Sequence, residues 1–242
     1  FSTSEAALTD SEDTAQLELL SRDPTMFYGE AARAAAPLKI VRVLPGVLNE
    51  ADILEENLRF YIDQGFETVV VENGSSDDSY AICERYVGKG ILRLVRFESE
   101  VFLPRALLKL ALTTARAFRP DWIVLADADE FIEPMEPGCT LREAITREHQ
   151  RGFNLIAQSH FMFRPTEVDR PDEPRLLERV RHYGRADDFG RAKVWRDSSA
   201  IDLENPHHPE FLDPSDRRLS PTRLALRHYP LRSEAQAFAK RL

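Results

Sequence analysis

Three carboxylates stand almost side by side in the middle of the chain, directly after an apolar run. Residues 121–126 read Asp-Trp-Ile-Val-Leu-Ala, and Asp127, Asp129 and Glu130 follow at once. If the strand that this run predicts continues through the acids, Asp127 and Asp129 point the same way, about 6–7 Å apart. Two like charges at that range repel by roughly 2–3 kcal/mol, so a partner must offset them. We favour a divalent cation bound by oxygen atoms, and an arginine that neutralises a surface turn is the alternative.

A cation that only two carboxylates hold keeps coordination positions open. Those positions suit the oxygens of a diphosphate, whose growing negative charge the cation would neutralise as the group leaves. The other common phosphate motifs are absent from the sequence, since it contains neither GxGxxG after the first strand nor GxxxxGK[ST]. The sequence therefore disfavours a dinucleotide-dependent dehydrogenase and a P-loop NTPase.

The segment before the acids alternates between short apolar runs and amphipathic runs. The apolar runs are continuous, as expected for strands that are covered on both faces. The order β-α-β-α-β-α-β predicts a mainly parallel sheet between two layers of helices, a three-layer α/β/α fold. We predict strands over residues 38–44, 67–73, 91–97 and 121–127, and helices over residues 50–65, 77–90 and 104–118.

The pattern is less regular after Pro134. A helix is predicted over residues 140–152, a strand over 153–163, a late strand over 222–229 and a final helix over 233–242. Residues 164–221 mix Pro, Arg, Asp and His with little periodicity. So long an irregular stretch in a compact domain is usually functional, and we expect a lid or a binding loop there.

Composition excludes several classes of protein. The net charge of −9 argues against a nucleic-acid binder, and no apolar run approaches the ~20 residues of a transmembrane helix. Cys83 and Cys139 lack the spacing of a metal or redox motif, so we expect free thiols in a reducing, cytoplasmic compartment. Residues 1–37 hold seven acidic and two basic residues, which predicts an acidic N-terminal extension.

Polar residues follow three of the predicted strands. Asn49 and Glu50 follow the first strand, residues 72–79 follow the second, and the acids follow the fourth. Each cluster alone is typical of an ordinary turn that opens a helix. Because ligands bind beyond the carboxyl ends of parallel strands, three clusters at that edge predict one shared binding site.

These residues resemble glycosyltransferase family 2, whose members have the GT-A fold. Residues 43–79 are similar to the family's Asn-Glu after strand one and its Asp-Asp-Gly-Ser-x-Asp after strand two, and residues 121–131 are similar to its DxD strand. The DxDEF form, with HYPLRSEAQAFAK near the end of the sequence, looks most like a bacterial subgroup. The resemblance implies a nucleotide-sugar-binding half over residues 38–135 and an acceptor-binding half with a C-terminal helix over residues 136–242.

The resemblance also implies roles for single positions around the nucleotide. Glu72 and Asn73 stand where the family's paired acids contact the base and ribose, although neither is Asp here. Asp77 would cap the second helix and support the loop. The base pocket would be formed by residues that follow or end the first strand, namely Leu44, Pro45, Asn49 and Glu50.

The metal and phosphate roles follow in the same way. Mn²⁺ or Mg²⁺ would be held by Asp129, by Asp127, which also lies near the ribose, and by a late-strand histidine. His228 fits that position, and His207 and His208 are the competing choice. The side chains that would reach the phosphates are Arg232 and Lys240.

The catalytic base is the least visible part of the site. A base takes the proton of the acceptor hydroxyl. We favour Glu210 because it follows the histidine pair, over Glu173, Asp187 and Asp188. The implied activity is transfer of a sugar from a UDP- or GDP-sugar to a glycan, lipid or protein hydroxyl, with inversion. A nucleotidyltransferase and a non-catalytic module that binds nucleotide or glycan are the alternatives.

Overall fold

The fold is taken from a computed structural model, which describes residues 37–99, 103–169, 172–185, 191–198, 201–202 and 209–239. The chain divides into two units, residues 1–37 and 38–242, and the description below concerns the second. The acidic extension predicted over residues 1–37 lies outside the described residues, apart from Pro37.

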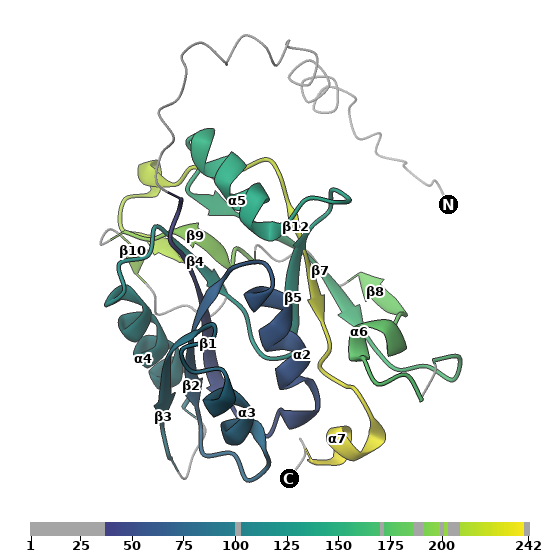
Figure 1. The fold of residues 1–242 in the computed structure, drawn as a ribbon. Helices are drawn as coiled ribbons and strands as arrows, with labels where there is room; N and C mark the ends of the chain where they lie inside the picture. Colours follow the sequence, from purple (N-terminus) through teal and green to yellow (C-terminus); the bar gives the residue numbers. More distant parts are fainter. Residues whose placement is uncertain are drawn as a thin grey trace, which may run out of the picture. The chain divides into compact units, whose positions relative to one another are not determined.

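Six strands form the main sheet, in the order β3-β2-β1-β4-β9-β6 (Figure 1). The first four are mutually parallel, and β9 and β6 extend the sheet in antiparallel fashion beyond β4. The predicted mainly parallel sheet is therefore confirmed. The strands are β1 (Ile40–Val47), β2 (Glu67–Glu72), β3 (Ile91–Arg96), β4 (Trp122–Leu125), β6 (Leu155–Ile156) and β9 (Val194–Arg196).

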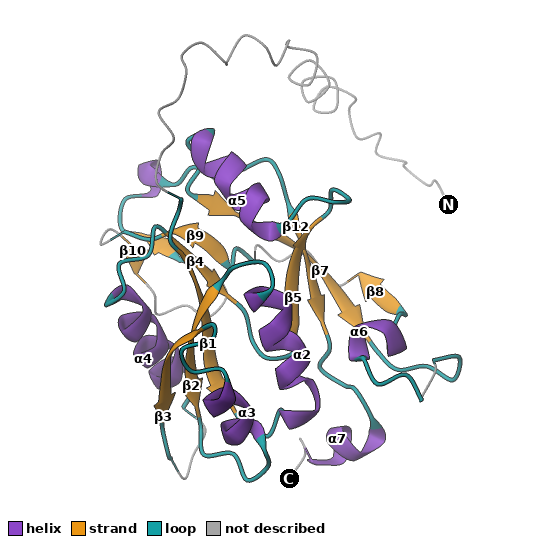
Figure 2. Ribbon diagram, in the orientation of Figure 1, coloured by secondary structure: helices purple, strands orange, loops and turns teal. Residues whose placement is uncertain are grey.

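Helices cover both faces of this sheet (Figure 2). α4 (Pro104–Arg116) buries Leu108, Ala111 and Leu112 against the valines of β1 and β2. α2 (Ala51–Ile62) and α3 (Ser79–Arg85) pack on the opposite face. Because β1, β2 and β4 are apolar on both faces, each face needs such a cover. The three-layer GT-A-like arrangement is confirmed.

A second sheet lies beside the first, in the order β5-β12-β7-β8. β12 is parallel to β7 and antiparallel to β5. Its strands are β5 (Glu130–Pro134), β7 (Gln158–Phe163), β8 (Tyr183–Arg185) and β12 (Leu224–His228). The remaining elements are α5 (Leu141–Gln150), α6 (Leu176–Arg179), β10 (Ile201–Asp202), β11 (Glu210–Phe211), η2 (Pro214–Asp216) and α7 (Glu234–Ala239).

The structure corrects three boundaries. The fourth strand ends at Leu125 and the chain turns before β5, so the acids do not continue the strand. The strand predicted over residues 153–163 is two strands in different sheets, β6 and β7. The irregular stretch 164–221 contains β9, whose Trp195 is buried in the core of the main sheet.

No helix of the described residues is long and apolar enough to cross a bilayer. Both cysteines are free thiols, and burial raises the pKa of Cys83 to about 12.

Candidate donor-binding and metal site

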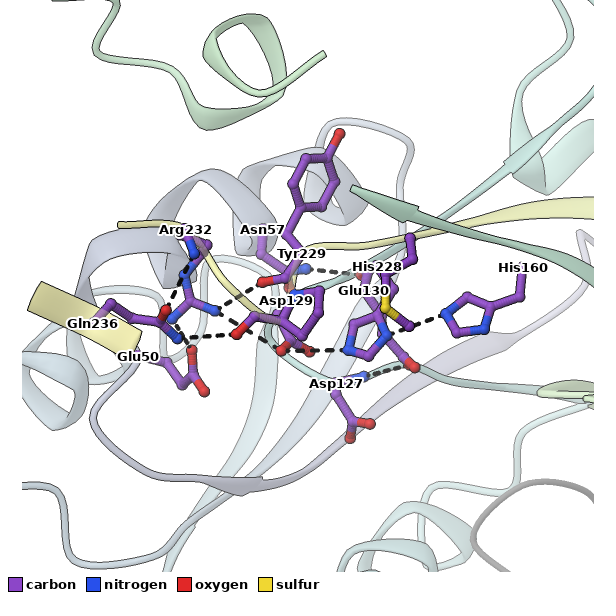
Figure 3. Close-up of polar contacts among 12 residues, drawn as sticks. Glu50, Asn57, Asp127, Asp129, Glu130, His160, His228, Tyr229, Arg232 and Gln236 are labelled. Atoms are coloured by element: carbon purple, nitrogen blue, oxygen red, sulfur yellow. Dashed lines mark hydrogen bonds and ion pairs between the residues drawn. The ribbon is translucent and has the colours of Figure 1, made fainter. Parts of the chain in front are cut away.

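The three acids lie in a tight turn between β4 and β5, which we call the acid turn (residues 126–130). Ala126 N donates to Val43 O at 3.1 Å, which continues the pairing of β4 with β1 for one more residue. Glu130 N then donates to Asp127 O at 3.1 Å and closes the turn. The expectation that Asp127 and Asp129 point the same way is therefore wrong, because alternation along a strand does not apply in a turn. In Figure 3 the Asp127 carboxylate points away from Asp129, and its side chain is 49% exposed.

Asp129 meets two basic side chains from the C-terminal part of the chain. Its Oδ2 lies 3.5 Å from His228 Nε2, at the end of β12, and 3.8 Å from Arg232 Nη1 (Figure 3). Tyr229 N donates to Asp129 O at 2.8 Å, which fixes the main chain of the turn against the end of β12. Asp129 and His228, which are 99 positions apart in the sequence, are thus brought together as predicted.

His228 also contacts a second histidine. His160 Nε2 lies 3.1 Å from His228 Nδ1, and the two rings are stacked with centroids 5.2 Å apart. Burial, with the charges of Arg191 and His228, lowers the pKa of His160 to about 4, so its ring is neutral at pH 7. Burial opposes the charged form of His228 as well, but the hydrogen bond to Asp129 and that carboxylate's charge raise the pKa of His228.

Glu130 has a different partner, the ammonium of Lys193. Lys193 Nζ hydrogen-bonds Glu130 Oε2 and lies 3.4 Å from Asp127 Oδ2. The Lys193 and Glu130 side chains are 3% and 2% exposed. Burial disfavours the charged forms of both groups, but their attraction is stronger, so the pKa of Lys193 is raised and that of Glu130 is lowered.

Arg232 is surrounded by carboxylates. Its Nε and Nη2 lie 2.7 and 2.8 Å from the two oxygens of Asp52, and Nη2 also hydrogen-bonds Glu50. The side chain is fully buried. Arg232 was predicted to reach the phosphates, and in this structure its guanidinium instead joins Glu50, Asp52 and Asp129.

A cavity of about 430 Å³ opens at the carboxyl ends of β1 and β4. Its walls come from β1, the start of α4, the acid turn and β12, which matches the expected site at the edge of a parallel sheet. Arg191, 27% exposed, adds a cation whose Nη1 lies 3.9 Å from Glu130 Oε1. The lining includes two residues that sequence reasoning missed, Arg191 and Lys193, and six of the predicted site residues: Leu44, Pro45, Glu50, Asp127, Asp129 and His228.

The other predicted nucleotide residues lie at the end of β2. Glu72 Oε1 accepts from Ser75 N at 2.5 Å, and Asn73 N donates to Val47 O at 2.7 Å. Glu72 and Asn73 are buried and are not among the lining residues of the cavity. Within the described residues, Glu72 Oε2 and Asn73 Oδ1 have no hydrogen-bond partner, although Arg96 Nε is 3.6 Å from Glu72 Oε2.

Asn49 and Asp77 join the loops that follow β1 and β2. Asn49 Oδ1 accepts from Ser76 N at 2.8 Å, and its backbone has a φ of 54°. Asp77 accepts from Ser79 N at 2.9 Å and from Ala51 N at 3.0 Å, the first residues of α3 and α2. The hydrogen bonds of both side chains thus hold the loops around the cavity in place.

Several predicted residues are not brought to the cavity or cannot be placed. Glu210 begins β11, is exposed, and is not among the lining residues that the structure describes. Glu173 lines a second cavity near α6. The predicted residues outside the described part of the chain are Asp187, Asp188, His207, His208 and Lys240.

Sequence reasoning missed Lys193, Arg191 and His160. The signal for Lys193 was slight: a single lysine before the apolar pair Val194-Trp195 in a stretch without periodicity. His160 was visible only as a polar residue within an apolar run, and it shares a sheet face with His228 because β7 and β12 are neighbours in parallel register.

The residues that are present fit a cation with few protein ligands. Adjacent ligands of a Mg²⁺-sized ion lie about 3 Å apart, so the 3.5 Å between Asp129 Oδ2 and His228 Nε2 suits an ion held between them. The described residues contain no group of three or more His, Cys, Asp or Glu that could hold a metal ion by themselves. Any ion here would depend on ligands from substrate or solvent, as Mg²⁺ sites commonly do.

Comparison with known proteins gives a family match and similar solved structures. Residues 46–148 match the family model for Glycosyl transferase family 2. Among solved structures, the chain is similar to S. aureus TarS (residues 1–349, in complex with UDP), with 15% identity, a TM-score of 0.46, and coverage of 79% of this chain and 60% of that one. Glucosyl-3-phosphoglycerate synthase from Mycobacterium tuberculosis gives 20% identity and a TM-score of 0.31, over 51% of this chain and 43% of that one.

The chain thus spans less than two thirds of the length of either solved structure. A comparison with curated proteins gives no match. The family match contains the acid turn, the start of α4 and the last two residues of β1, whereas Leu44, Pro45, Arg191, Lys193 and His228 of the cavity wall lie outside it. This match covers fewer than half of the 242 residues, and the enzyme class that it indicates is glycosyltransferase.

Proposed function

We propose that this chain is a metal-dependent glycosyltransferase that moves a sugar from a nucleotide-diphosphate sugar to an acceptor hydroxyl, with inversion at the anomeric carbon. The observation that carries the proposal is the pair Asp129–His228. Their facing atoms are 3.5 Å apart at the wall of a cavity whose acid turn lies within the family match. The donor in this proposal is a UDP- or GDP-sugar, and the acceptor is a hydroxyl of a glycan, a lipid or a protein.

Asp129 and His228 would hold Mn²⁺ or Mg²⁺, which would neutralise the charge that develops on the departing nucleoside diphosphate. With an ion bound, a neutral His160 would accept a hydrogen bond from His228 Nδ1, 3.1 Å away, which would leave the lone pair of His228 Nε2 to the ion. Arg191 lies on the cavity wall, partly exposed, and would bind a diphosphate oxygen. Lys193 keeps Glu130 ionised and forms an ion pair with it, so Glu130 would not bind the cation.

The nucleotide would lie along the end of β1, where Leu44, Pro45 and Gly46 line the cavity. Glu72 Oε2 and Asn73 Oδ1 are buried acceptors without a hydrogen-bond partner among the described residues. Buried acceptors favour a ligand that supplies donors. Uracil and guanine both carry N–H donors next to a carbonyl, and we propose UDP- and GDP-sugars as the donors. Neither Glu72 nor Asn73 lines the cavity, so a base would reach these acceptors only if the end of β2 opened.

A panel assay tests the proposal. The chain is incubated with UDP- and GDP-sugars in Mn²⁺, Mg²⁺ or a chelator, and free nucleoside diphosphate and pyrophosphate are measured. We expect nucleoside diphosphate release with one nucleotide class, and loss of that release with chelator. Release of pyrophosphate instead would identify a nucleotidyltransferase.

Two variants and one control connect the activity to the site. Asp129→Asn and His228→Gln should each lower the release rate by at least about 100-fold, because each removes an ion ligand while keeping side-chain size. Glu133→Gln is the matched control. It lies on β5 as Glu130 does and pairs with Arg227 at 3.3 Å, so its rate should stay near that of the wild type. Absence of both turnover and metal-dependent nucleotide binding in the wild type would refute the proposal.

A further inference from the structure

A buried arginine lies under the acid turn without a carboxylate partner. Arg42, in β1, is fully buried, and it forms no ion pair with a carboxylate among the described residues. Its Nη2 donates to Asn57 Oδ1 at 2.5 Å, to Ala126 O at 3.2 Å and to Asp127 O at 3.4 Å. The guanidinium lies over the ring of Tyr61, 4.2 Å from the centroid. Arg42 thus holds the main chain at the start of the acid turn.

Two residues one turn apart on α2 hold the other end. Asn57 Nδ2 donates to Glu130 O at 2.9 Å (Figure 3). Tyr61 Oη donates to the same carbonyl at 3.2 Å and accepts from Ile132 N at 2.9 Å. Since Arg42 also contacts Asn57 and Tyr61, the three side chains form one buried group, which we call the turn support (Arg42, Asn57, Tyr61).

Filling this space with the turn support costs free energy, because it buries the charge of Arg42. A buried charge is costly unless an opposite charge pairs with it, and apolar side chains of similar volume are often at least as stable. Within the described residues, Arg42 Nε and Nη1 have no hydrogen-bond partner. Burial lowers the pKa of Arg42 to about 10, so the group still carries its charge at neutral pH. Ordinary core packing does not account for such a residue.

What the turn support does contact is main chain. Its bonds go to the carbonyls of residues 126, 127 and 130 and to the amide of Ile132, and they leave the acidic side chains free to face Lys193, His228 and the cavity. Its positive charge also attracts the carboxylates of Asp127 and Glu130. A metal ligand held by such outer contacts keeps its geometry when substrate enters.

We propose that Arg42, Asn57 and Tyr61 are positioning residues, which fix the acid turn from the side of the sheet so that Asp129 stays within reach of His228. The proposal rests on the proposed function in one respect only, namely that the acid turn is where the donor binds. The fold keeps Arg42 for this purpose although an apolar residue would be at least as stable there.

Hydrogen exchange tests the proposal without substrate. Exchange rates of peptides covering residues 126–132 are compared for wild type, Arg42→Met and Tyr61→Phe, together with melting temperatures. We expect exchange in this segment to be roughly tenfold faster in Arg42→Met, with a melting temperature equal to or above that of the wild type. Tyr61→Phe keeps the ring beside Arg42 and should accelerate exchange around Ile132 alone.

Thr68→Val is the matched control. Thr68 is buried beside Arg42 in the register of β1 and β2, and its Oγ1 has no hydrogen-bond partner among the described residues, so exchange in the acid turn should not change. Equal exchange in residues 126–132 for wild type, Arg42→Met and Tyr61→Phe would overturn the proposal. So would a fall in melting temperature with faster exchange throughout β1, β2 and β4, since Arg42 would then be an ordinary core residue.

Turnover separates this inference from the proposed function. If the wild type releases nucleoside diphosphate, Arg42→Met should lower kcat by at least about 10-fold with little change in KM for the donor, because the ligand is mispositioned and the nucleotide pocket is intact. If the wild type shows no turnover, the proposed function fails and the exchange experiment still decides this inference.

Discussion

The two sides of the acid turn carry the same charge and differ in what balances it. On the Asp129 side, the carboxylate faces the cavity and two basic side chains, His228 at 3.5 Å and Arg232 at 3.8 Å. On the Glu130 side, the ammonium of Lys193 is buried against the carboxylate, with both side chains almost fully excluded from solvent. Two acids adjacent in sequence therefore lie in opposite kinds of surroundings.

The difference separates a permanent counter-charge from an exchangeable one. Lys193 cannot move away from Glu130 without leaving two buried charges unpaired, so this side acts as a fixed, internally neutral pair. His228 can lose its proton and present a lone pair to a cation beside Asp129. The comparison predicts that changes on the Glu130 side reduce stability, whereas changes on the Asp129 side reduce activity.

Breaking the Glu130 side should give the largest effect. Lys193→Met keeps the length of the side chain and removes its charge, which leaves the buried Glu130 without its nearest cation and with Arg191 Nη1 at 3.9 Å. We expect the free energy of unfolding to fall by about 3–5 kcal/mol, as is typical when one member of a buried pair is removed. Urea denaturation of the wild type and the variant measures this difference.

A second substitution separates charge from packing. Because Glu130→Gln removes the orphaned charge, Lys193→Met with Glu130→Gln should recover most of the lost stability. Lys89→Met, at an exposed position, is the control and should change stability by less than about 0.5 kcal/mol. A loss below about 1 kcal/mol in Lys193→Met alone would show that the Glu130 side is not a fixed pair.

On the Asp129 side, pH gives a smaller effect with a definite sign. His160 takes up a proton near pH 4 in the folded protein and near pH 6.5 in the unfolded chain. Between these values the unfolded chain binds more protons, so stability is lost as the pH falls. We expect His160 to contribute a loss of about 2 kcal/mol between pH 7.5 and pH 5.0.

The measurement is urea denaturation at both pH values for wild type and His160→Gln. The variant should lose less stability than the wild type by about that amount, because glutamine does not titrate. His182→Gln, at an exposed position, is the control and should follow the wild type. Equal losses in wild type and His160→Gln would mean that the pKa of His160 is the same in the folded protein and in the unfolded chain.

The contrast between the two sides could be predicted only in part. The parallel strands, the helices between them and the edge where the acids lie all follow from apolar periodicity and chain order. The association of Asp129 with His228 was expected from a family resemblance. The local sequence pattern did not show that the fourth strand ends at Leu125. The hydrogen bond from Glu130 N to Asp127 O closes a turn, so Asp127 and Asp129 do not point the same way.

The Glu130 side could not be predicted for a different reason. Lys193 reaches it because β9 pairs antiparallel with β4, and β9 is three residues long in a stretch without periodicity. Pairing between strands 70 positions apart leaves no local signal. The turn support could not be predicted either. Arg42 lies in a strand and Asn57 in a helix, and in both elements the apolar neighbours determine the sequence pattern.

Substitution of Glu210 should have the smallest effect, because this residue lies on neither the Asp129 side nor the Glu130 side of the acid turn. A general base is worth about 10²–10⁴-fold in rate, so the sequence hypothesis predicts a loss of that size for Glu210→Gln. In the structure Glu210 is exposed on β11 and does not line the cavity, which predicts a loss below about threefold. Nucleoside diphosphate release decides between the two, with Asp213→Asn, at another exposed acid, as the control. A loss above 100-fold in Glu210→Gln alone would show that the acceptor side closes over the cavity during turnover.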